Sequence, residues 1–222
     1  IEFYAALGIN RLSVGVQSFN DELLKFLGRR YTGKFAVDAI TGCRKYFENI
    51  NCDIIFAVPK HQTIAILERD IDILLDLNIP HIAIYNLTIE PKSYFGWLAK
   101  RRAITEIDDE HYEKQYLSIN RKLTAVGFKH YEISTYSIAG FECAHNLTYW
   151  RNREYIGLGA AAHSYLNGRR SWNLKYPSEY IAAINKRNSA EFGFEILPED
   201  KLLGETIMLA LHLDDGVIIS EI

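Results

Sequence analysis

A short segment at residues 141–165 gathers most of the side chains in this sequence that could bind a metal or a flat ligand. Imidazole and thiolate groups bind iron or zinc, and indole and phenol rings stack against planar molecules. The segment therefore indicates a binding site, with the alternative that these groups are satisfied packing residues near strand ends. The candidates are Cys143, His145, Tyr149, Trp150 and His163, around a glycine-alanine turn.

The cysteines Cys43, Cys52 and Cys143 show none of the short spacings of a metal motif. A zinc ribbon or an iron–sulfur cluster needs several thiolates, commonly arranged as CxxC or CxxxC. We therefore expect no such cluster to be built from this chain alone. Cys43 lies on the apolar face of a predicted helix and Cys52 precedes a buried strand, so both are predicted to lie in the core.

Composition and charge exclude several classes of protein. The chain has 222 residues, of which 48% are hydrophobic, enough for one large α/β domain or for one domain with an appendage. We find neither an apolar run of bilayer length nor a signal peptide, so a soluble, cytoplasmic protein is expected. The net charge of -3 argues against a nucleic-acid-binding surface. The arginine pair at 169–170 is expected to be solvated.

Short apolar runs alternate with amphipathic segments through residues 1–140. Apolar runs predict strands, and apolar residues at helical spacing predict the helices between them. This alternation indicates parallel βα units, and near-continuous apolar strands indicate that both faces of the sheet are covered. We therefore predict an α/β fold with half or more of a TIM-like barrel. The predicted strands cover residues 11–17, 52–58, 81–87 and 130–134. One helix is predicted to begin near residue 21, and three more are predicted at residues 34–47, 63–77 and 106–126.

Polar residues at the ends of these strands should meet at one rim, because the carboxyl ends of parallel strands carry the functional groups in barrels. Gln17, residues 58–59, residues 86–88 and Glu132 occupy such positions. Asp53 differs because it lies inside an apolar strand, where an ionised carboxylate needs hydrogen-bond donors. It is either satisfied by backbone groups at the strand entry or an acceptor for ligand hydroxyls.

The pattern changes after Tyr136. Asn167-Gly168 between two short runs predicts an antiparallel hairpin of residues 161–165 and 169–173, because both turn positions favour positive φ. The chain begins at Ile1 and stops within what looks like an unfinished element, so a fragment of a longer protein is expected. Helices are predicted at residues 178–188 and 198–211. The chain is therefore predicted to have three regions. They are a partial barrel at residues 1–140, a barrel-edge segment with the hairpin at 141–176, and a truncated helical C-terminal region at 177–222.

Several segments, in this order, resemble successive blocks of the radical S-adenosylmethionine family, in the group of oxygen-independent coproporphyrinogen III oxidases and related heme chaperones. The resemblance covers nearly the whole chain. It implies S-adenosylmethionine and a 4Fe-4S cluster as cofactors of the full-length protein, with the cluster cysteines upstream of Ile1. The chain by itself is then expected to be inactive in radical chemistry. The segments are GINRLSVGVQSFNDELLKFLGRR, NCDIIFAVP, YNLTIEP, GFECAHNLTYW and YIGLGAAAHSY.

The resemblance also implies which residues bind S-adenosylmethionine. Gln17 and Asp53 would hold its ribose, and Arg29 would pair with its methionine carboxylate, a task suited to a guanidinium group. Thr88 would lie near the adenine. The turn after the Asp53 strand departs from the family's glycine-leucine-proline, because residues 57–59 read Ala-Val-Pro.

Residues 145–150 match an HNxxYW pattern that the resemblance associates with the heme chaperones and not with the oxidases. His163 likewise stands where the oxidases would have an aliphatic residue beside a second S-adenosylmethionine. The branch implies that these residues handle heme, with a histidine as axial iron ligand and aromatic rings as a stacking wall. The alternative is that they only lock the barrel edge. The heme candidates are His145, Asn146, Tyr149, Trp150 and His163.

Three functions remain open. The favoured one is a heme chaperone that binds heme and delivers it to heme-accepting proteins. The second is an oxidase that converts propionates of coproporphyrinogen III to vinyl groups through a 5′-deoxyadenosyl radical. The third is a cofactor-free interaction or structural module. An uncovered barrel edge in a fragment would also favour self-association.

Overall fold

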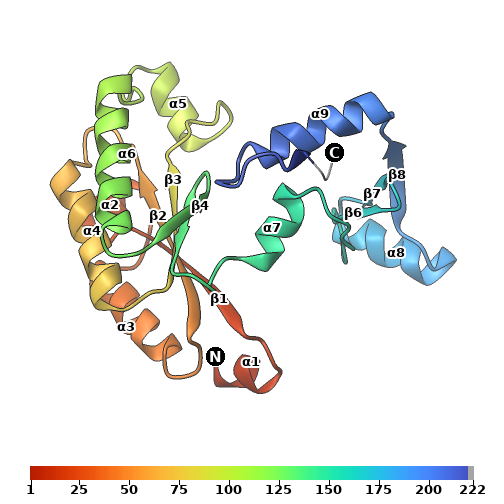
Figure 1. Ribbon diagram of the computed structural model, residues 1–222, viewed down its shortest axis with the longest axis horizontal. Helices are drawn as coiled ribbons and strands as arrows, with labels where there is room; N and C mark the ends of the chain where they lie inside the picture. Colours follow the sequence, from red (N-terminus) through yellow and green to blue (C-terminus); the bar gives the residue numbers. More distant parts are fainter. Residues whose placement is uncertain (220–222) are drawn as a thin grey trace. The chain divides into compact units, whose positions relative to one another are not determined.

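The computed structural model describes residues 1–219 and divides into two compact units. The first unit is Ile1–Glu142, and the second begins at Cys143. Each unit has a β-sheet of its own (Figure 1). Within the described residues, no helix is both long and apolar enough to cross a lipid bilayer. The predicted C-terminal region runs to residue 222, and its last three residues lie outside the described part.

The first unit is built on a five-stranded sheet of order β1-β2-β3-β5-β4. Its first three strands pair in parallel and are connected through helices, which confirms the predicted α/β fold of parallel βα units. The strands are β1 (Arg11–Gln17), β2 (Asn49–Phe56), β3 (His81–Asn86), β4 (Lys129–Glu132) and β5 (Thr135–Ser137).

The predicted strand at residues 130–134 is confirmed only in part, because β4 ends at Glu132 and a second short strand, β5, follows the turn. The chain forms a tight hairpin there, and β5 pairs antiparallel with β3. The Glu132 carboxylate stabilises the turn by accepting hydrogen bonds from the Ser134 N–H at 3.3 Å and from the Thr135 hydroxyl. Glu132 is therefore only 5% exposed and does not lie on an open rim as predicted. Such local side-chain bonds leave no mark on strand periodicity.

The helices α2 to α6 of the first unit each begin at a side chain that satisfies a free backbone N–H group. Asn20, Thr32, Thr63, Ser93 and Asp108 each accept a hydrogen bond from a first-turn N–H. Figure 1 shows α3, α4 and α6 along one side of the sheet. The helices are α1 (Glu2–Ala6), α2 (Asp21–Phe26), α3 (Gly33–Cys43), α4 (Ile64–Asp76), α5 (Tyr94–Lys100) and α6 (Asp109–Thr124), of which α1 and α5 were not predicted.

The two faces of β2 differ in polarity. Ile50, Cys52 and Ile54 are fully buried in the hydrophobic core, together with apolar side chains of α3, α4 and α6. The alternate residues Asn51 and Asp53 point to the opposite face. Asn51 and Asp53 thus interrupt the near-continuous apolar pattern of this strand on one face. Its polar face carries the site described below.

The second unit contains a three-stranded antiparallel sheet of order β6-β7-β8. The predicted hairpin is confirmed, with φ of 51° at Asn167 and 72° at Gly168. The elements are α7 (Ala144–Trp150), β6 (His163–Leu166), β7 (Arg169–Asn173), α8 (Pro177–Arg187), β8 (Glu191–Ile196) and α9 (Glu199–Ala210), of which α7 and β8 were not predicted.

Strand β8 joins the predicted hairpin segment to the predicted C-terminal region, so the structure groups them in one unit. Arg169 and Arg170, which were expected to be solvated, are partly exposed, and each also pairs with a carboxylate of β8 or α9. Arg169 donates from both terminal nitrogens to Glu191 at 2.8 and 2.6 Å, and Arg170 donates to Glu205 at 3.0 Å. The spacing of residues along the sequence could not predict these ion pairs, because the partner carboxylates lie on other elements.

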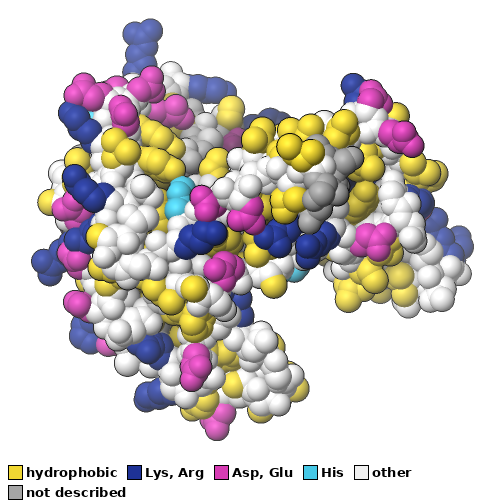
Figure 2. Space-filling view, viewed as in Figure 1, with side chains coloured by type: hydrophobic (Ala, Val, Ile, Leu, Met, Phe, Trp, Pro, Cys, Tyr) yellow, Lys and Arg dark blue, Asp and Glu magenta, His cyan; other side chains and the backbone are white. Residues whose placement is uncertain are grey.

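The surface carries charges of both signs. Figure 2 shows Lys and Arg side chains interspersed with Asp and Glu on the face in view. Hydrophobic side chains gather over α9 in the same view, where Leu203, Met208 and Leu211 are 44%, 54% and 69% exposed.

Candidate functional site

The carboxyl end of β1 carries Gln17 in a strained backbone conformation. Its φ is 67°, and the Ser18 N–H donates to the Val16 carbonyl at 2.9 Å, which closes a γ-turn around Gln17. A γ-turn with positive φ is rare and strained for a residue that has a side chain. The pairing of β1 with β2 shifts register between Gly15 and Gln17, next to this turn.

Gly15 forms the floor of a small polar site between β1 and β2. A Cβ added to Gly15 would lie 2.9 Å from Gln17 Nε2 and 4.0 Å from Asp53 Oδ2. The amide and the carboxylate therefore face the same space above Gly15, which a larger residue would fill. An amide and a carboxylate side by side can bind two neighbouring hydroxyl groups.

Asp53 is satisfied by side chains of the sheet rather than by backbone groups. Asn51 Nδ2 donates to Asp53 Oδ1 at 2.6 Å, and Ser13 Oγ donates to the same oxygen at 3.4 Å. Burial raises the pKa of the Asp53 carboxyl, although these two hydrogen bonds and the charge of Arg11 act in the opposite direction. With both bonds on Oδ1, Asp53 presents Oδ2 toward Gly15.

A buried chain of hydrogen bonds supports Asn51. His81 Nδ1 lies 2.7 Å from Asn51 Oδ1, and His81 Nε2 lies 2.7 Å from the Tyr131 hydroxyl. Because Asn51 Oδ1 only accepts, His81 donates through Nδ1 and accepts the Tyr131 proton at Nε2. Burial and the charge of Arg11 lower the pKa of His81 to about 3, so the imidazole is neutral.

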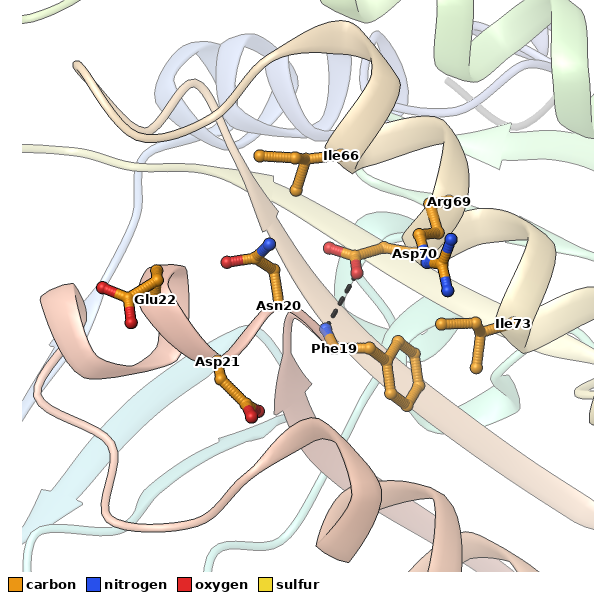
Figure 3. Close-up of a pocket in the computed structure, with 8 residues that line it drawn as sticks. All are labelled: Phe19, Asn20, Asp21, Glu22, Ile66, Arg69, Asp70 and Ile73. Carbon is orange, nitrogen blue, oxygen red and sulfur yellow. Dashed lines mark hydrogen bonds between the residues drawn. The ribbon is translucent and has the colours of Figure 1, made fainter.

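Asp70 on α4 holds the chain directly after Gln17 (Figure 3). Its Oδ1 accepts from the Phe19 N–H at 2.8 Å, and its Oδ2 accepts from Ser18 Oγ at 2.6 Å. Asp70 is 2% exposed at the wall of a pocket of about 270 Å³. Burial raises its pKa to about 6, although both hydrogen bonds oppose the rise.

Arg29 and Thr88 lie on exposed loops at this end of the sheet. The Arg29 loop is tied to the site through Tyr31, whose hydroxyl donates to the Gly15 carbonyl at 2.9 Å. Burial raises the pKa of Tyr31, and the nearby Arg29 charge opposes the rise. Thr88 follows the end of β3, and its hydroxyl accepts from Asn86 Nδ2 at 3.4 Å. The first unit thus brings Gln17 and Asp53 together, with Arg29 and Thr88 on flanking loops.

Helix α7 in the second unit pairs two of the heme candidates. His145 and Tyr149 are one turn apart, their rings meet edge to face at 4.9 Å, and the Tyr149 hydroxyl lies within hydrogen-bond distance of His145 Nε2, at 3.2 Å. The other side of Tyr149 packs against Tyr155 at 4.7 Å. His145 is exposed, while Asn146 is half-buried.

Trp150 and His163 make other contacts. The Trp150 indole stacks on His212 at 4.6 Å, so one of its faces is already covered. His163 lies beside Trp172 at 5.8 Å and lines a pocket of about 510 Å³ with aromatic walls. The contacts thus separate the heme candidates into three groups, centred on His145, Trp150 and His163.

The cysteines of the first unit are core residues, as predicted. Cys43 and Cys52 are buried, and burial raises the pKa of Cys52 to about 12, which keeps it a thiol. In residues 1–219, no group of three His, Cys, Asp or Glu side chains is arranged to hold a metal ion.

Comparisons with known proteins decide the family. Residues 1–64 match the family described as the radical SAM superfamily. The chain is 35% identical over 223 residues to heme chaperone HemW of Lactococcus lactis subsp. lactis, covering 100% of this chain and 58% of that protein. It is 37% identical to heme chaperone HemW of Bacillus subtilis, covering 95% of this chain and 55% of that protein. The chain belongs to the radical SAM superfamily, and over its whole length it is similar to proteins named heme chaperone HemW.

The fold agrees with this assignment. The solved structure of coproporphyrinogen III oxidase (HemN) from Escherichia coli superposes with a TM-score of 0.75 at 20% identity, covering 94% of this chain and 51% of that one. This radical SAM chain spans little more than half the length of the curated relatives it matches. Radical SAM proteins in general use S-adenosylmethionine and a 4Fe-4S cluster.

The polar site of this radical SAM chain fits the ribose of S-adenosylmethionine. The ribose carries two adjacent hydroxyls, and the space above Gly15 has an amide and a carboxylate oxygen facing it. Sequence reasoning missed the supporting residues Gly15, Tyr31, His81 and Asp70. The alternation Asn51-Cys52-Asp53 was the one available signal, since it marks a polar strand face.

Proposed function

We propose that this chain is part of a heme chaperone that binds heme and passes it to heme-accepting proteins. The observation that carries the proposal is the similarity to proteins named heme chaperone HemW, which extends over the whole chain at 35% identity. In the full protein, S-adenosylmethionine and a 4Fe-4S cluster would be its cofactors. We also expect this chain to self-associate, and light scattering tests this by measuring its molar mass in solution.

Within this proposal, Gln17 and Asp53 bind the ribose hydroxyls of S-adenosylmethionine. Gln17 Nε2 donates to one hydroxyl, and Asp53 Oδ2 accepts from the other, since both face the space above Gly15. Arg29 pairs with the methionine carboxylate, and Thr88 lies near the adenine. S-adenosylmethionine supplies the 5′-deoxyadenosyl group on which the chemistry of the superfamily depends.

His145 is the heme ligand that the geometry of the second unit favours. Its imidazole is exposed, and the Tyr149 ring fixes its orientation through an edge-to-face contact. Asn146 and Trp150 support the same helix, and His163 is the second candidate because it faces an aromatic-walled pocket. An exposed, oriented imidazole is what axial coordination of heme iron requires.

His145→Ala is expected to weaken heme binding about tenfold or more, because the axial nitrogen is lost. A titration of full-length protein with heme, followed by its Soret band, measures the effect. His111→Ala is the matched control, since His111 is also exposed but lies on α6 of the first unit. Loss of affinity in His163→Ala, with His145→Ala unchanged, would move the ligand to His163. Unchanged binding in both variants contradicts the assignment of either histidine.

A further inference from the structure

The strained turn at Gln17 needs a support outside the polar site. A residue with a side chain is strained at φ of 67°, so an isolated chain would relax to another conformation. If the turn relaxed, the Gln17 amide would leave the space above Gly15 that it shares with Asp53. The support must therefore fix the backbone on either side of Gln17.

Asp70 fixes the side that follows Gln17. It reaches from α4, 52 residues away from Ser18 in sequence, and accepts hydrogen bonds from the Ser18 hydroxyl and the Phe19 N–H. The Ser18 oxygen in turn accepts from the Asn20 N–H at 3.0 Å, so three successive residues are held. Figure 3 shows the Asp70 carboxylate aimed at the Phe19 backbone.

The preceding side of the turn is held by different groups. Gly15 is paired with Asp53 in the β1–β2 ladder, and the Tyr31 hydroxyl donates to its carbonyl. Gln17 thus lies between β1, which the sheet holds in place, and residues 18–20, which the buried Asp70 carboxylate holds in place. Ser18 is fully buried and Asp70 is 2% exposed, so water does not compete for these bonds.

We propose that Asp70 is a positioning residue for S-adenosylmethionine: its two hydrogen bonds hold the strained turn that aims Gln17 at the ribose. This inference rests on the proposed cofactor site. Asp70 lies under the turn and acts through Gln17. Its loss therefore lowers cofactor affinity only while the Gln17 amide is present.

A double-mutant cycle tests this dependence. S-adenosylmethionine affinity of the full-length protein is measured by calorimetry at pH 8 in the wild type, Asp70→Ala, Gln17→Ala and the double variant. Asp70→Ala is expected to weaken binding about tenfold in the wild-type background, and less than twofold in the Gln17→Ala background. Asp72→Ala is the control, because Asp72 is an exposed carboxylate on the same helix that pairs with Lys122.

Two further measurements separate positioning from misfolding. Asp70→Asn keeps an acceptor for the Phe19 N–H and should retain more affinity than Asp70→Ala. Hydrogen exchange should speed up at the Ser18 and Phe19 amides in Asp70→Ala while the core amides of β2 stay protected.

Equal losses from Asp70→Ala in both backgrounds, or none in either, would overturn the proposal, as would unchanged exchange at Phe19. A wild-type protein without affinity for S-adenosylmethionine would instead refute the proposed cofactor site, and with it the role of Gln17.

Discussion

Lowering the pH from 6.5 to 3 is expected to reduce the free energy of unfolding of the first unit by about 5 kcal/mol through His81 alone. The folded pKa of His81 is about 3, because the ring is buried, against 6.5 for an ordinary histidine. Between these values the unfolded chain binds a proton that the folded chain does not. The stability contributed by His81 is therefore present above pH 6.5 and lost as the pH falls toward 3.

Urea unfolding at a series of pH values measures this loss. His81→Phe keeps a ring in the site and removes the titrating group, so the difference in stability between wild type and variant should shrink as the pH falls. The variant is less stable at pH 8, because Asn51 Oδ1 and the Tyr131 hydroxyl lose their partner. A difference that is independent of pH contradicts the prediction and means that folded His81 takes up its proton normally.

Asp70 opposes this trend and needs its own control. Its folded pKa of about 6 lies above the ordinary 3.8, so its contribution to stability is present below pH 3.8 and lost as the pH rises through 6. The corresponding energy is about 3 kcal/mol, smaller than that of His81. Of these two groups His81 has the larger effect, and Asp70→Asn should make the acid loss larger than in the wild type.

Gly33→Ala is expected to lower the free energy of unfolding of the first unit by about 3 kcal/mol. A Cβ at Gly33 would lie 2.0 Å from the Phe19 carbonyl oxygen and 2.7 Å from its carbonyl carbon. Both atoms are backbone, so no rotamer change relieves the contact, and the loop before α2 must move away from α3. Denaturant unfolding of the purified variant measures the loss.

Gly42→Ala is the matched control on the same helix. Within the described residues, nothing lies within 4 Å of a Cβ at Gly42, so alanine should stabilise α3 by up to about 1 kcal/mol. Gly33→Ala should also weaken S-adenosylmethionine binding, since Phe19 follows the turn that carries Gln17. Equal stability of the two variants would show that the loop at Phe19 yields freely.

Local signals in the sequence were sufficient for most of the elements, although α1, α5, α7 and β8 were missed. The apolar run of β1, the helix start near residue 21 and the Asn167-Gly168 turn each depend on neighbouring residues, and all three features are present. The segments that resemble radical SAM proteins were likewise readable in order along the chain. Periodicity and capping are local properties, so a single sequence carries them.

Contacts between distant residues were decided by the tertiary structure alone. Trp150 stacks on His212, 62 positions further along the chain. Asp70 gave no sequence signal, because its partners Ser18 and Phe19 approach it only after α4 packs against the sheet.

The sequence by itself therefore determined an α/β fold of parallel βα units and the resemblance to radical SAM proteins, since apolar runs, helical spacings and matching segments are local patterns along the chain. The tertiary structure decided how Gln17 and Asp53 come to face one space. That arrangement depends on the strained turn, the Gly15 floor and the buried Asp70 and His81, which lie far apart in the sequence. Hydrogen bonds between such residues form only when the strands and helices pack, so no local pattern records them.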